Sequence, residues 1–170
     1  MKTAALNLYT LSYRNTKTYL AALAFVAGNI LLPQLFHVVP KGGIIFLPIY
    51  FFTLIGAYKY GWKVGLITAV CSPLLNHALF GMPAMGVLPE IMLKSSLLAI
   101  AAGAAASYFK RISLLILLGV VLSYQLIGTL GEWAITGSLY TAVQDFRIGI
   151  PGMLLQVVGG YAFIKYVLKK

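Results

Sequence analysis

Long apolar stretches along this chain alternate with short segments that contain polar residues, glycine or proline. The apolar stretches cover about 18–37, 44–58, 64–80, 87–108, 112–135 and 148–167. A helix needs roughly 20 mainly apolar residues to cross the hydrocarbon core of a bilayer. The pattern therefore predicts an all-α integral membrane protein: one domain, 1–170, folded as a six-transmembrane-helix bundle. The second stretch is short for a full span, and it is expected to tilt or to be partly re-entrant.

Composition supports the same fold class, because 61% of the 170 residues are hydrophobic and only 9% are charged. Soluble domains carry about 25% charged residues. The first apolar stretch follows Arg14 and Lys17 and is longer than the roughly 7–15 residues of a signal-peptide core. It is expected to remain as a helix, preceded by an interfacial segment at 1–17.

Charge is distributed unevenly between the two predicted ends of the bundle. The basic residues occur singly or in pairs at the ends of apolar stretches, so the net charge of +10 does not indicate nucleic-acid binding. The side that holds both termini collects Lys2, Arg14, Lys17, Lys59, Lys63, Lys110, Arg111, Lys165, Lys169 and Lys170. The other side has Lys41 and Arg147, with Lys94 inside a helix. Because cytoplasmic loops are rich in lysine and arginine, both termini are expected to be cytoplasmic.

The other polar and helix-breaking residues have the opposite bias. All three acidic residues, both histidines and all seven prolines fall in the predicted outer half or outer loops. Many lie in the stretch CSPLLNHALFGMPAMGVLPEIMLK, from Cys71 to Lys94. Irregular backbone and ionisable groups at membrane depth usually line a wet cavity or are buried in protein. The pattern predicts a cavity that opens outward and is closed below by regular helices.

Several side chains are candidates for lining that cavity. Glu90 and Lys94 share a helix face and can pair, either as a structural ion pair or in contact with a ligand. Three polar stripes converge on the outer end, although each alone is typical of helix packing. They are Thr68, Ser72 and Asn76; Gln125, Gly128 and Glu132; and Gly152, Gln156, Gly159 or Gly160, and Phe163.

Residues with chemical reactivity are few. Cys71 most often would be a small buried residue, with a soft ligand to a cofactor metal as the functional alternative. His37 and His77 are expected to form hydrogen bonds near loops rather than to bind metal. No HExxH, GxSxG or phosphate-binding glycine motif occurs, so no enzymatic activity and no ATP site of the Walker type are predicted.

In the order of its predicted helices and in several sequence segments, the chain resembles the S components of energy-coupling factor (ECF) vitamin transporters. The resemblance rests on the small-residue face of the first helix, YLAALAFVAGN, and on LPIYFFTLIGAYKYGWKVGLITAVCSPLLNHALFG. The segment RIGIPGMLLQVVGG also fits. The resemblance covers most of the chain, and no single motif in it is highly specific.

The resemblance implies binding of a vitamin or its precursor on the extracytoplasmic side of the cytoplasmic membrane, followed by toppling to release it. It also implies association with a transmembrane coupling protein and two ATPases through Ala24 and Gly28. Gly28 stands where the family often has alanine. The implied ligand-binding residues, combined with the candidates above, are His37, Cys71, Asn76, His77, Glu90, Lys94, Gln125, Glu132, Trp133, Asp145, Arg147 and Gln156. Cys71 resembles the cobalt ligand of cobalamin-specific members, so cobalamin is one option and another ring-containing vitamin the other.

Two other classes of function stay open from the residues alone. A small membrane enzyme acting on a lipid-like substrate would need convergent acid–base residues, often near the cytosol, where this chain has no acids. A channel or structural subunit would need a polar path across the whole membrane, whereas the inner ends of the predicted helices are apolar.

Overall fold

The computed structural model describes residues 8 and 10–168, and every regular element among them is a helix. The all-α prediction is therefore confirmed. Five helical segments of the described chain are long and apolar enough to cross a membrane: Thr16–Phe36, Trp62–Phe80, Met85–Phe109, Leu114–Thr136 and Ile150–Val167. They correspond to α1 (Thr16–Phe36), α4 (Trp62–Phe80), η2 (Met85–Val87) with α5 (Leu88–Phe109), α6 (Leu114–Thr136), and the segments α9 to η4.

The last of these five helices changes its winding along its length. It runs through α9 (Ile150–Leu154), η3 (Leu155–Gly159), α10 (Gly160–Ala162) and η4 (Phe163–Val167), of which η3 and η4 are π-helical. It begins two residues later than the expected start at 148. Two of its glycines allow close packing, since Gly159 lies beside Phe51 and Gly160 beside Leu54.

Local signals in the sequence explain where the helices begin and end. The side chain of Asn15 accepts a hydrogen bond from the backbone N–H of Lys17 at the start of α1, and Ser113 does the same for Ile116 in α6. Such caps satisfy donors that a helix N-terminus leaves free. Gly81 and Gly137 end α4 and α6 in the left-handed region, each with φ of 68°, where glycine is favoured.

The second apolar stretch is not the single helix expected at 44–58. It forms α2 (Gly42–Phe46), the 3-10 turn η1 (Pro48–Tyr50) and α3 (Phe51–Tyr60). The break is at Leu47, which has φ of 46° and precedes Pro48, a position at which helical geometry is disfavoured. With 10 residues, α3 extends about 15 Å, half of the roughly 30 Å hydrocarbon core. This segment is therefore not among the helices long enough to cross a membrane, and the predicted count of six spans is not confirmed.

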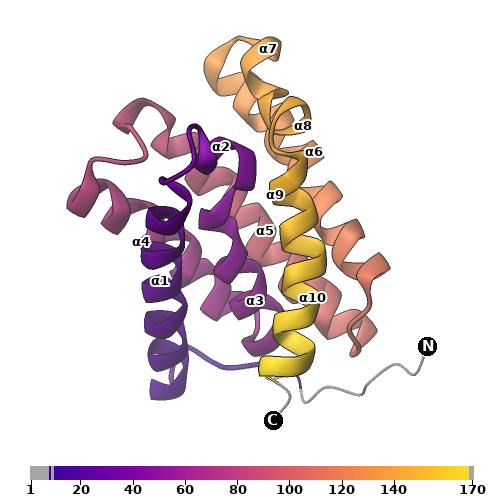
Figure 1. Ribbon diagram of the computed structural model, residues 1–170. Coiled ribbons are helices and arrows are strands. Elements are labelled where there is room, and N and C mark those ends of the chain that lie inside the picture. The colour runs from indigo at the N-terminus through magenta and orange to yellow at the C-terminus, as the bar shows by residue number, and fades with distance from the viewer. Residues whose placement is uncertain (1–7, 9, 169–170) are drawn as a thin grey trace.

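Although short, α3 is the central helix of the bundle. It packs against α1, α4 and α5, while α5 also packs against α4 and α6 (Figure 1). Leu54, Ile55 and Tyr58 are fully buried within it. Small residues bring the neighbouring helices close: a Cβ atom on Gly103 would lie 2.7 Å from the backbone nitrogen of Trp62.

A polar network inside the bundle joins α1 to α3 and α4. The Asn29 side-chain amide donates to Thr53 Oγ1 at 3.0 Å and to Ser72 Oγ at 3.3 Å, and its Oδ1 accepts from the backbone N–H of Phe52 at 3.0 Å. Phe52 lies in the first turn of α3, where backbone donors lack partners within the helix. Asn76 in turn donates to the carbonyl oxygen of Asn29 at 2.9 Å. Ser72 and Asn76 of the α4 stripe therefore contribute to helix packing, because both bond to Asn29 of α1.

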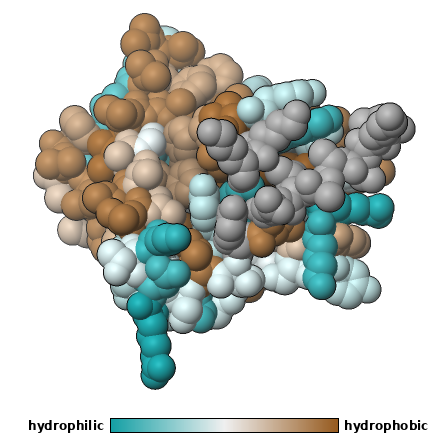
Figure 2. All heavy atoms as spheres, turned by 90° about the horizontal axis from the view of Figure 1, so that it is seen from below, coloured by the Kyte–Doolittle hydropathy of each residue, from teal (hydrophilic) through white to brown (hydrophobic). Residues whose placement is uncertain are grey.

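The two ends of the bundle differ in charge. In Figure 1, α1 begins and η4 ends at the lower end, while α2, α7 (Leu139–Ala142) and α8 (Gln144–Arg147) lie at the upper end. Figure 2 shows the lower end, where hydrophilic side chains project among hydrophobic ones. Arg14, Lys17, Lys110 and Arg111 are exposed, whereas Lys59 is buried at the end of α3. Lys63 and Lys165 are half-buried, and the other three predicted cations, Lys2, Lys169 and Lys170, lie outside the described residues.

We expect the Gly65→Ala substitution to destabilise the protein, because α4 crosses α3 and α5 closely at this point. A Cβ atom on Gly65 would lie 3.0 Å from Cα of Ala57 and 3.0 Å from Cβ of Ala99. Overpacking of this kind costs about 1–3 kcal/mol. Thermal unfolding in detergent measures the effect. The control is Gly119→Ala, since a Cβ atom there meets no atom within 4 Å; equal stability of the two variants would contradict the prediction.

Candidate binding cavity

A cavity of about 340 Å³ lies at the end of the bundle opposite the start of α1. Its walls come from the end of α1, the broken segment α2–η1, the end of α4, the start of α5, the end of α6, and α7–α8. The predicted site residues that line it are His37, Asn76, Glu90, Lys94, Glu132 and Asp145. Segments that are far apart in the sequence therefore bring half of the twelve predicted residues together.

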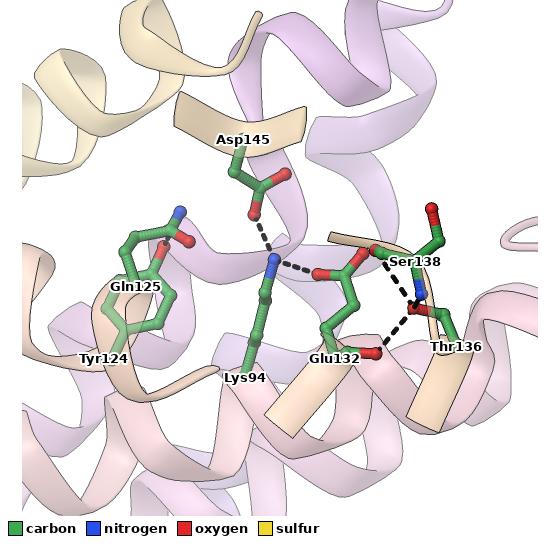
Figure 3. A network of polar contacts seen from close by, with 7 residues as sticks. All are labelled: Lys94, Tyr124, Gln125, Glu132, Thr136, Ser138 and Asp145. Atoms are coloured by element: carbon green, nitrogen blue, oxygen red, sulfur yellow. Dashed lines mark hydrogen bonds and ion pairs between the residues drawn. The ribbon is translucent and has the colours of Figure 1, made fainter. Parts of the chain in front are cut away.

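Lys94 of α5 lies at the centre of the charged groups (Figure 3). Its Nζ donates to Asp145 Oδ2 of α8 at 2.8 Å and also forms an ion pair with Glu132 Oε2 of α6. All three side chains are at least 90% buried. One ammonium group thus joins three elements at the cavity wall.

The pairing of Lys94 differs from the one expected along α5. Glu90 is four residues away on the same helix, but the acids in contact with Nζ are Glu132 and Asp145. Spacing within one helix shows which side chains are neighbours on its surface. It does not reveal acids that other helices present at a shorter distance.

Gly128 of α6 makes room for the lysine. A Cβ atom at this position would lie 2.6 Å from Cγ of Lys94, so no larger residue fits without displacing the aliphatic part of that side chain. The stripe of Gln125, Gly128 and Glu132 therefore has three separate roles. Glu132 binds the ammonium group, Gly128 leaves space for it, and Gln125 points into a second network.

That second network connects α6 to the π-helical segment η3. The Tyr124 hydroxyl donates to Gln156 Oε1 at 2.9 Å, and Gln125 Nε2 donates to the Tyr124 oxygen at 3.1 Å. Gln125 and Gln156 are fully buried but do not line the cavity. Tyr124 was not predicted as part of the site, although two buried glutamines facing each other require a polar partner of this kind.

Two cavity groups are hydrogen-bond acceptors without a donor in the described chain. Glu90 is 9% exposed and has no hydrogen-bond or ion-pair partner among the described residues. Asn76 is 2% exposed; its Nδ2 donates to the carbonyl oxygens of Asn29 and Ser72, and its Oδ1 has no partner. Buried acceptors are normally satisfied, so these two groups can each accept a donor from a bound molecule.

The other predicted site residues lie away from the cavity. Cys71 is half-buried on α4 and is not part of the wall. His77 Nδ1 lies 2.8 Å from the Pro83 carbonyl oxygen, which ties the end of α4 to the following loop. Trp133 is 46% exposed on the outside of α6. Arg147 is exposed; its guanidinium group donates to the Tyr140 hydroxyl at 2.8 Å and lies 4.0 Å from the centre of that ring.

Some lining residues were not among the predicted ones. Gln34 of α1, Tyr50 of η1, and Thr141 and Gln144 of α7–α8 also line the cavity. Tyr50 was missed because its segment was predicted as a regular helix. No group of three or more His, Cys, Asp or Glu side chains within the described residues is arranged to hold a metal ion.

We expect Lys94→Met to destabilise the protein by about 3–5 kcal/mol, because removing one partner of a buried ion pair leaves the other charge uncompensated. Thermal unfolding in detergent is the measurement. The triple variant Lys94→Met, Glu132→Gln and Asp145→Asn removes all three charges and should recover much of the loss. Arg147→Met is the control on the exposed surface and should change stability by no more than about 0.5 kcal/mol. A Lys94→Met protein as stable as the wild type would contradict the assignment.

Comparison with protein-family models, with curated proteins and with solved structures finds no match to this chain. The features of the structure that bear on function are therefore the cavity and the charged side chains that line it.

Proposed function

We propose that this protein is the substrate-binding subunit of a membrane importer, of the kind represented by the S components of ECF vitamin transporters. It binds a small ring-containing molecule in the cavity on the extracytoplasmic side. The observation that carries the proposal is the concentration of buried charge at one end of an apolar bundle. Glu90, Lys94, Glu132 and Asp145 all line that one cavity, and ionisable groups within membrane segments usually serve function.

The size of the cavity supports a ligand with one small ring system. Its 340 Å³ is near the lower end of the roughly 300–1,000 Å³ of small-molecule sites. Of the two options raised by the sequence, cobalamin is therefore the less favoured. The thiol that would contact cobalt belongs to Cys71, which is not part of the cavity wall.

The interior below the cavity supports a binding subunit over a channel. Leu98 follows Lys94 by one turn of α5 and is fully buried, as are Leu54 of α3 and Leu117 of α6. A continuous polar path would need to pass through this apolar core. All three acids of the chain line the cavity. An enzyme acting on lipid-like substrates would need acids near the basic end instead.

Delivery of the ligand requires partners, and α1 offers a surface for them. Leu20, Leu23, Ala24, Ala27 and Leu31 are exposed on α1. Gly28 contributes less than expected to this surface, because a Cβ atom there would lie 2.7 Å from the Phe52 ring. In the proposal, the coupling protein packs on the Ala24 side of α1, two ATPases supply the energy, and the basic end with both termini faces the cytoplasm.

The test is purification of the full chain in detergent, followed by mass spectrometry of the small molecules released from it. We expect a ring-containing compound to co-purify with the wild type and to be lost from Gly43→Phe. Gly43 lines the cavity, and a Cβ atom there meets no atom within 4 Å, so the phenyl ring can enter the cavity.

The matched control is Gly86→Phe, because Gly86 has equal space around its Cα but does not line the cavity. This variant should retain the compound. Retention by Gly43→Phe, or absence of any compound from the wild type even after incubation with cell extract, would contradict the proposal. Conversion of the bound compound by the purified protein would favour an enzyme instead.

A further inference from the structure

The charges of the cavity do not balance. The whole chain has 3 acidic residues and 13 lysines and arginines. All three acids, Glu90, Glu132 and Asp145, line the cavity, and within the part of the chain that the structure describes Lys94 is the one lysine or arginine of the wall. Among the described residues, His37 is the one other side chain of the wall that can become a cation, and it is exposed. A net basic protein thus has a cavity with more carboxylates than ammonium groups.

The single ammonium group is already engaged. Lys94 Nζ contacts one carboxylate oxygen of Glu132 and one of Asp145. An anionic ligand could therefore pair with this ammonium group only by displacing one of the two acids. Displacement would leave that acid unpaired in a site of low dielectric, which is costly. The cavity is therefore poorly suited to a carboxylate or phosphate.

Two buried groups of the wall are acceptors without a donor among the described residues. Glu90 has no hydrogen-bond or ion-pair partner among the described residues. Asn76 provides an independent second acceptor, because its Oδ1 is buried without a partner. The orientation of this amide is fixed by its Nδ2, which donates to two carbonyl oxygens at 2.9 and 3.0 Å. A rotated amide would place oxygen against oxygen.

We propose that the ligand of this cavity is a small cation that carries N–H donors next to a ring, such as an amidinium or a protonated amine. Glu90 binds its positive charge and Asn76 Oδ1 accepts one of its N–H groups. The inference rests on the proposed binding function and assigns the chemical class of the substrate. The attraction is strong because the cavity is surrounded by apolar helices that screen charge weakly.

Three flat probes of nearly equal size test the charge preference. Benzamidinium is a cation with N–H donors, benzamide is its neutral analogue, and benzoate is the anion. Each is titrated into the full chain in detergent, and the rise in melting temperature gives a Kd, because a ligand that binds the folded state stabilises it. We expect the Kd of benzamidinium to be at least about tenfold lower than that of benzamide, since hydrogen bonds to charged groups are the stronger ones. Benzoate should cause no shift.

Two substitutions of nearly equal size assign the preference to residues. Glu90→Gln should reduce the ratio of the benzamide Kd to the benzamidinium Kd by about tenfold. Its benzamide binding should persist, which shows that the cavity is intact. Gln34→Glu adds a carboxylate to the wall and should tighten benzamidinium binding. Cys71→Ser lies away from the wall and should change neither Kd.

The outcomes separate this inference from the proposed function. Preference of the wild type for benzamide or benzoate would overturn the cationic ligand but leave a binding cavity. Absence of a shift with all three probes, together with no co-purified compound, would overturn both. An unchanged preference in Glu90→Gln, or weaker benzamidinium binding in Gln34→Glu, would overturn the assignment of the charge to this cavity.

Discussion

The contact of Lys94 with Glu132 and Asp145 is the interaction on which the upper half of the molecule depends. Taking three charged groups out of water is costly, and only close mutual pairing offsets that cost. The ion pairs join α5, α6 and α8. Other features follow from the need to fit these charges. Gly128 leaves room for the lysine side chain, and all three acids of the chain lie at the wall of one cavity.

The lower half of the bundle follows a simpler rule. Lipid provides no hydrophobic driving force between helices, so close packing of small residues and buried polar contacts hold them together. Gly65 and Gly103 let helices approach at short range, and Asn29 satisfies a backbone donor of α3 through its side chain. The central helix α3 can therefore be short: its polar ends are covered by neighbours and do not need to reach the lipid headgroups.

Much of the fold was predictable because hydrophobic length is a direct consequence of bilayer thickness. The five long helices of the described chain follow from that constraint. The break at Leu47 was not predicted, because the residues around it are apolar and only Pro48 signals an interruption. Similarly, the sequence identifies Lys94, Glu132 and Asp145 as candidates. Their pairing with one another could not be predicted, because it depends on contacts between different helices. Cys71 shows the opposite case: its distinctive chemistry makes it a candidate, yet it does not line the cavity.

The short helix α8 carries two charges with different surroundings. Asp145 points inward to Lys94, while Arg147, two residues further on, is exposed and bonded to Tyr140 of α7. Outward movement of α7–α8 would keep the Arg147–Tyr140 contact within the moving unit but would separate Asp145 from Lys94. Such a movement would therefore break one buried ion pair while leaving the surface contact of the same helix intact.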